Sequence, residues 1–163
     1  MKRNNQIRLI KMGYVTTLII VLLFSFKDAA RGFEDGYSEG GKEGGFGLLV
    51  GGLILLITFF GLRILVYLYR FIDSVQAGNV FNEENAGRLK HMGWYCTIIP
   101  FALFFYNASV YVDRFGNHKN LFLSIVENVD FQIWLLIFGL TLLTIAFVFK
   151  KGIELKQEND LTI

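Results

Sequence analysis

The stretch FQIWLLIFGLTLLTIAFVF, residues 131–149, decides the fold of this protein because it contains no Asp, Glu, Lys, Arg or His. An α-helix rises about 1.5 Å per residue, so crossing a hydrocarbon core of about 30 Å takes roughly 20 apolar residues. The stretch has about this length and is followed at once by Lys150 and Lys151. It is therefore predicted to be a membrane-spanning helix.

Three further apolar stretches have the same character. Residues 45–62 and 94–112 also lack charged residues and histidine, and the former continues as an apolar helix to about residue 69. Residues 12–26 reach spanning length if the helix begins near residue 7, with two basic side chains extending toward the headgroups. The sequence thus predicts one all-α domain over residues 1–163, an integral membrane four-helix bundle. Its spans are expected at about 7–26, 45–69, 94–112 and 131–149.

The distribution of basic residues predicts the orientation of these spans. Of the 16 Lys and Arg residues, eleven lie in the N-terminal segment, between spans two and three, or in the C-terminal tail 150–163, and five lie in the other two loops. Cytoplasmic segments hold the excess of Lys and Arg. We therefore expect a multi-pass protein of a bacterial cell (inner) membrane with both termini cytoplasmic and with residues 28–44 and 113–130 outside. A cleaved signal peptide is the alternative for the first stretch, although Ser25–Asp28 does not form a small-residue cleavage site.

The segment between spans two and three carries signals for a short cytoplasmic helix. A Gly-Asn pair at 78–79 predicts a turn. Asn82 is a suitable N-cap, and the two glutamates that follow it would occupy the first turn, where the helix dipole favours anions. Phe81 stands at the position of a hydrophobic staple. We expect an elbow helix at about 82–93 that fixes the angle of span three, with a partner-docking helix as the alternative.

Small and polar residues inside the predicted spans indicate where helices pack. Gly47 and Gly51 form a G-x-x-x-G pair, which allows two helices to approach closely. This face is predicted to pack either inside the protein or against a second copy in a homo-oligomer. Asn107, inside span three, is expected to face protein and to join neighbouring helices, because a buried amide needs a hydrogen-bond partner.

Residues for catalysis or metal binding are not apparent. No predicted span has a carboxylate, lysine or histidine near its middle, where proton-coupled transporters need such groups. His91 and His118 fall on opposite sides of the membrane in the predicted topology, so they cannot share a metal or a haem. We therefore predict that the protein is not an enzyme and holds no cofactor or metal, with direct nucleic-acid binding also not expected. An enzyme acting on a lipid or quinone is the remaining alternative.

Two stretches carry a family resemblance. The first has the pattern F-x-x-E-N-x-x-R-L-x-x-x-G-W, formed by Phe81, Glu84, Asn85, Arg88, Leu89, Gly93 and Trp94. The second has the pattern F-x-x-G-x-E-L-x-x-E-N-D-L-T-I, formed by Phe149, Gly152, Glu154, Leu155, Glu158, Asn159, Asp160, Leu161, Thr162 and Ile163. With its length and four predicted spans, the chain resembles the small bacterial membrane proteins of the domain of unknown function 2975 family.

The resemblance implies a partner but no established activity. Members of the family are typically encoded beside a small helix-turn-helix regulator of the phage-repressor type, which implies a cytoplasmic transcription factor as partner. Both patterns lie on the predicted cytoplasmic side, where a helix or tail can dock in a groove. The candidate docking residues are Phe81, Glu84, Asn85, Arg88, Leu89, Glu158, Asn159, Asp160, Leu161, Thr162 and Ile163.

Two alternatives to partner docking remain open. In one, the tail and the elbow helix pack on each other, with Glu84 or Glu158 meeting Arg88 or Lys150. In the other, the chain is a transport or export accessory that works as a homo-oligomer through the Gly47 and Gly51 face.

Overall fold

The computed structural model describes residues 5–20, 23, 44–115 and 121–160. Residues 5–20 form an N-terminal helical segment, and the helices that follow are α2 (Gly44–Gln76), α3 (Glu83–Phe115), α4 (Leu121–Asn128) and α5 (Ile133–Asp160). The three long helices cover the second, third and fourth predicted spans, which confirms the all-α prediction. Part of the span predicted at 7–26 and nearly all of the loop 28–44 lie outside the described residues.

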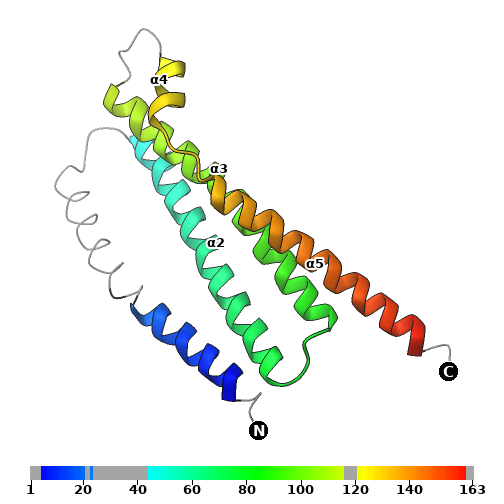
Figure 1. Cartoon of the computed structure of the whole chain (residues 1–163). Helices are drawn as coiled ribbons and strands as arrows, with labels where there is room; N and C mark the ends of the chain where they lie inside the picture. Colours follow the sequence, from blue (N-terminus) through cyan, green and yellow to red (C-terminus); the bar gives the residue numbers. More distant parts are fainter. Residues whose placement is uncertain (1–4, 21–22, 24–43, 116–120, 161–163) are drawn as a thin grey trace.

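Helix α3 lies between α2 and α5 and packs against both (Figure 1). The N-terminal segment lies against α2, where Lys11 forms an ion pair with Asp73 and the Tyr14 hydroxyl donates a 2.8 Å hydrogen bond to the carbonyl of Leu65. The start of the N-terminal segment, the α2–α3 turn and the end of α5 all lie toward one end of the molecule (Figure 1). The short helix α4 lies at the opposite end.

Two glycines bring α3 and α5 into close contact. A Cβ added at Gly139 would lie 2.6 Å from Oγ1 and 2.8 Å from the backbone N of Thr97, and one added at Gly93 would lie 2.8 Å from Cγ of Leu143. Only a residue without a side chain allows the helices to approach this closely. By contrast, a Cβ added at Gly51 would meet no atom within 4 Å, so the described residues offer no internal partner for that predicted face.

Helix α3 is longer than the sequence pattern predicted. The residues 82–93 expected as a separate elbow helix are instead the N-cap and first turns of α3, which continues through Gly93 and through the fully buried Pro100. The prediction of a separate helix is wrong because Gly93 provides close contact with α5 and does not end the helix. Leu89 and Met92 are buried in a small core with Ala146 of α5 and do not lie on the surface.

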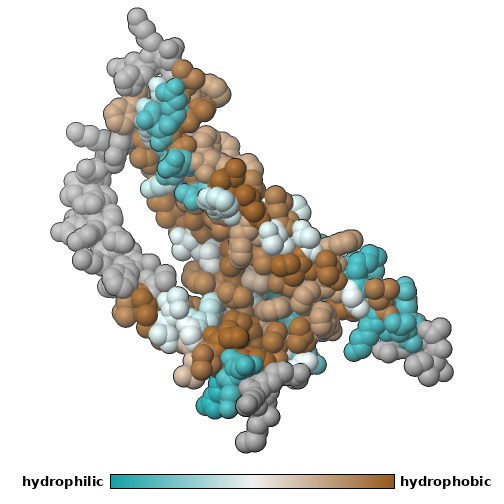
Figure 2. All heavy atoms as spheres, viewed as in Figure 1, coloured by the Kyte–Doolittle hydropathy of each residue, from teal (hydrophilic) through white to brown (hydrophobic). Residues whose placement is uncertain are grey.

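Large apolar side chains cover much of the outside of the molecule. Leu55, Phe105 and Trp134 are 71%, 62% and 80% exposed. Figure 2 shows this apolar surface along the middle of the molecule, with polar residues toward its ends. Three helical stretches, Val50–Gln76, Glu83–Asp113 and Ile133–Asn159, are long and apolar enough to cross a membrane. Exposed apolar surface on this scale is unusual for a soluble monomer and indicates a surface that contacts lipid or protein.

Candidate functional site at the α2–α3 turn

Helix α2 ends in a turn that requires a glycine. The N–H of Gly78 donates to the carbonyl of Val75 at 3.1 Å, and the N–H of Asn79 donates to the carbonyl of Ser74 at 3.0 Å. This pair of bonds is a Schellman motif, which needs a left-handed residue directly after the helix. Gly78 has φ +86°, a conformation that strains any residue with a side chain. The Gly-Asn turn predicted from the sequence is confirmed.

Asn82 is the N-cap of helix α3, which begins at Glu83. The Oδ1 of Asn82 accepts a 2.7 Å hydrogen bond from the N–H of Asn85, which satisfies one of the free donors at the helix start. Glu83 and Glu84 lie in the first turn, as predicted. The Nδ2 of Asn82 also donates to the carbonyl of Asn79 at 3.0 Å. The cap therefore joins the start of α3 to the turn that follows α2.

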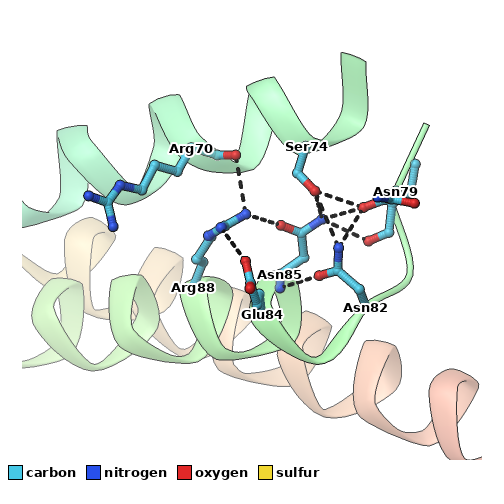
Figure 3. A network of polar contacts seen from close by, with 8 residues as sticks. Arg70, Ser74, Asn79, Asn82, Glu84, Asn85 and Arg88 are labelled. Carbon is cyan, nitrogen blue, oxygen red and sulfur yellow. Dashed lines mark hydrogen bonds and ion pairs between the residues drawn. The ribbon is translucent and has the colours of Figure 1, made fainter. Parts of the chain in front are cut away.

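Asn85 is the centre of the polar contacts drawn in Figure 3. It is completely buried, with 0% of its surface exposed. Its Nδ2 donates to Oγ of Ser74 at 2.9 Å, to the carbonyl of Asn79 at 2.8 Å and to the carbonyl of Val80 at 3.0 Å. Buried polar groups that lack partners are costly, so this amide stabilises one particular path of the turn. We call the contacts among Ser74, Asn79, Asn82, Glu84, Asn85 and Arg88 the hairpin network.

Arg88 connects the hairpin network to α2. Its Nη1 donates to Oδ1 of Asn85 at 2.7 Å and to the backbone carbonyl of Arg70 at 3.3 Å. Its Nη2 meets Oε2 of Glu84 at 2.6 Å, an ion pair one helical turn apart. Figure 3 shows the guanidinium of Arg88 between the two helices, whereas the guanidinium of Arg70 points away along α2. A planar group with several donors can make these three contacts, whereas an ammonium cannot reproduce their geometry.

An open pocket of about 600 Å³ lies beside the hairpin network. Its charged lining residues are two cations, Arg70 and Arg88, and three carboxylates, Asp73, Glu83 and Glu84. This balance does not favour a phosphate or a nucleic-acid backbone, which would need an excess of positive charge. Within the described ranges, no three His, Cys, Asp or Glu side chains are placed to hold a metal ion.

The C-terminal part of α5 packs on the start of α3. The rings of Phe81 and Phe149 lie 4.9 Å apart between centroids, those of Phe71 and Phe149 lie 6.2 Å apart, and Ile153 is buried. Phe81 is thus packed against α5 in addition to its place before the cap. Phe81 of the first family-like stretch therefore contacts Phe149 of the second. The ion pair of Glu84 with Arg88 lies within α3 and does not join the two stretches, so the packing of the tail on this segment stays a prediction.

The candidate docking residues divide into buried and accessible ones. Asn85 and Leu89 are buried and cannot be reached by a partner in this structure. Phe81 and Glu84 are exposed beside the turn, whereas Glu158 and Asn159 lie in the last turn of α5, which ends at Asp160. Leu161, Thr162 and Ile163 lie outside the described residues.

The predicted packing residues have a mixed outcome. Gly47 lies in α2, but its surroundings lie outside the described residues. Asn107 is half-buried in α3, and its side chain has no hydrogen-bond partner among the described residues, so its expected role in joining helices stays a prediction.

Sequence reasoning missed several residues of the site. Ser74 and the carbonyl of Arg70 take part in these contacts although neither family-like pattern contains them, and Asn79 was predicted only as part of the turn. Ser74 lies near the end of an apolar helix, where a single serine gives no signal. Asn85 follows a helix cap and two glutamates, a context that gives no signal of burial, and its contact with Ser74 exists only after the chain has turned back.

The protein is therefore a helical protein in which three of the described helices are long and apolar enough to cross a membrane. At one end of the molecule, hydrogen bonds between polar side chains hold the turn between α2 and α3. Residues 20–163 match the family described as protein of unknown function DUF2975, and the chain belongs to this family. The resemblance seen in the two sequence patterns is thereby confirmed. No curated protein and no solved structure matches the chain.

Proposed function

We propose that this protein is a non-enzymatic, multi-pass membrane protein that binds a cytoplasmic regulatory protein. The membrane placement is supported by three long apolar helices and by the apolar surface along the middle of the molecule (Figure 2). We propose that residues 7–26 form a fourth span, of which residues 7–20 are helical.

The proposed orientation has both termini in the cytoplasm. The N-terminal segment, the α2–α3 turn and the end of α5 lie toward one end of the molecule (Figure 1). Eleven of the 16 Lys and Arg residues lie in the N-terminal segment, on the parts of α2 and α3 that lead into and out of this turn, or after residue 149. The positive-inside rule would place this end in the cytoplasm.

The observation that carries the docking proposal is the extension of α5 beyond its apolar part. The helix continues from Lys150 to Asp160, and Leu155 on this extension is 60% exposed. A pocket of about 360 Å³ lies between the α2–α3 turn and this extension, with Phe81 and Lys156 in its lining. Phe81 lines this pocket and is 61% exposed, and Leu155 is exposed on the α5 extension. Exposed apolar side chains of this kind can serve as anchors for a partner.

The proposed partner is a small helix-turn-helix DNA-binding regulator. The family resemblance motivates this choice, and the mixed charges of the α2–α3 turn are compatible with a protein surface. Binding would hold the regulator at the membrane and away from its operator, and a change in the membrane or in the outer loops would release it.

Photocrosslinking in native membranes tests the proposal. A photoreactive residue is placed at Leu155 on the α5 extension, and the matched control carries it at Leu55, which is exposed on the apolar surface of α2. We expect a discrete adduct with a small DNA-binding protein from position 155 and none from position 55. Adducts from position 155 that contain only this chain would contradict the proposal.

A transport or export accessory that assembles as a homo-oligomer is the second candidate. It is favoured by the open space around Gly51 and Gly52, where an added Cβ would meet nothing within 4 Å. Native mass spectrometry of the protein in lipid tests it, because exclusive recovery of monomer would exclude this assembly.

A further inference from the structure

A groove of about 540 Å³ lies between the first half of α3 and the middle of α5. Its floor is made of small or branched residues, Ala86 and Gly87 of α3 and Leu143 and Ala146 of α5. A Cβ added at Gly87 would meet no atom within 4 Å, so the groove is open above this glycine. The groove is separate from the hairpin network, which faces α2.

The groove changes from apolar to charged along its length. Trp94 and Phe147, which are 50% and 62% exposed, form its walls at the end toward the middle of the helices. Lys90 lies four residues before Trp94, or about 6 Å along the axis, and Lys150 lies three residues after Phe147. Glu83 lies at the outer end. An exposed tryptophan beside lysines is typical of the level of the lipid headgroups.

We propose that this groove binds an anionic phospholipid of the phosphatidylglycerol type, an inference that rests on the proposed membrane placement. One acyl chain would lie along Leu143, Phe147 and Trp94, and the phosphate would lie between Lys90 and Lys150. The glycerol hydroxyls of the headgroup would donate to Glu83. Two lysines and one glutamate leave the groove with one net positive charge, which complements the single negative charge of this lipid.

The cations of the groove are available for such a ligand. Lys90 has no hydrogen bond or ion pair with any other described residue. Lys150 is 63% exposed and lies 4.0 Å from Glu154, whose other oxygen already pairs with Lys151 at 2.6 Å. Basic pockets between membrane helices are a recurrent way to hold phospholipid headgroups.

Native mass spectrometry of the purified full chain tests the proposal. The protein is mixed with equal amounts of phosphatidylglycerol, phosphatidylethanolamine and phosphatidylcholine, and the lipid-bound fractions are compared. We expect a preference for phosphatidylglycerol that the double variant Lys90→Gln/Lys150→Gln lowers on the order of 20-fold, because each lysine near the surface contributes about fivefold. Equal retention of the three lipids by the unchanged protein would overturn the proposal.

Two further variants separate the groove from general surface charge. Lys151→Gln/Lys156→Gln removes the same charge from the same end of α5 but outside the groove, and it should retain the preference. Gly87→Leu fills the groove and leaves its charges in place, and it should lose the preference. The groove would not be the site if Lys151→Gln/Lys156→Gln lost as much of the lipid preference as Lys90→Gln/Lys150→Gln. The groove would also not be the site if Gly87→Leu retained the preference.

Two controls distinguish the possible failures. Added inorganic phosphate should not displace the lipid, because it cannot use the apolar wall, and displacement would mean that the site takes a free anion. Extraction of cell membranes with alkaline carbonate tests the membrane placement itself. Release of the chain into the soluble fraction would refute the proposed function, whereas retention without any lipid preference would refute the lipid site alone.

Discussion

The contact between α3 and α5 at Gly139 allows a sharp prediction about stability. The change Gly139→Ala adds one methyl group that would lie 2.6 Å from Thr97 Oγ1, 2.8 Å from Thr97 N and 3.0 Å from the carbonyl carbon of Cys96. Ordinary contact begins at 3.4 Å, so the nearest backbone atom is about 0.6 Å too close. Backbone atoms of a helix cannot move individually, and the two helices would have to separate along their contact.

The expected magnitude follows from two opposing effects. Overpacking of a close contact costs about 1–3 kcal/mol, and the upper part of this range applies because backbone atoms are involved. Replacing glycine by alanine in a helix gains about 1 kcal/mol. We therefore expect Gly139→Ala to lower the free energy of unfolding by about 2 kcal/mol. The change Thr97→Ala removes only the hydroxyl contact, so it should restore little of this loss.

The matched control is Gly61→Ala in α2, because a Cβ there meets no atom within 4 Å. It should be neutral or raise the stability by up to about 1 kcal/mol. The measurement is equilibrium unfolding in mixed micelles, followed by far-UV circular dichroism. If the Gly139→Ala and Gly61→Ala proteins had the same free energy of unfolding, the conclusion that α3 and α5 are in close contact at Gly139 would be refuted.

Three further predictions concern the hairpin network, measured by the same unfolding assay. Asn85→Ala should lower the free energy of unfolding by about 2–4 kcal/mol, because it removes a completely buried amide that donates to Ser74 and accepts from Arg88, whereas the cap variant Asn82→Ala should lower it by about 1 kcal/mol; equal losses would contradict the central place of Asn85. Gly78→Ala should cost about 1 kcal/mol, because alanine is strained at φ +86°, and a neutral result would mean that the turn has another conformation. Arg88→Lys should lower the free energy of unfolding by about 1–3 kcal/mol. Glu84→Gln should change it by less than about 1 kcal/mol, because the side chain of Glu84 is 77% exposed. If Glu84→Gln had the larger effect, the ion pair would matter more than the bonds of Arg88 to Asn85 and Arg70.

Packing details could not be predicted because they depend on contacts between distant residues. Among the glycines, Gly47 and Gly51 match the G-x-x-x-G spacing, yet the close contacts are at Gly93 and Gly139, neither of which has a glycine four residues away. Whether a glycine faces a helix or open space depends on the rotation of each helix about its axis. That rotation is set by the whole contact surface and leaves no local signature.

The sequence by itself determined the class of fold and the local signals. Uninterrupted apolar stretches of about 20 residues can satisfy their backbone only as helices in an apolar environment, which accounts for α2, α3 and α5. Gly78 and Asn82 act within a few residues of chain, so the positions of the turn and of the start of α3 could be predicted from the sequence. The tertiary structure alone decided that Asn85 is buried against Ser74, that Arg88 reaches the carbonyl of Arg70, and that Phe81 packs on Phe149. These contacts join residues on separate helices, and they exist only once the helices have packed against one another.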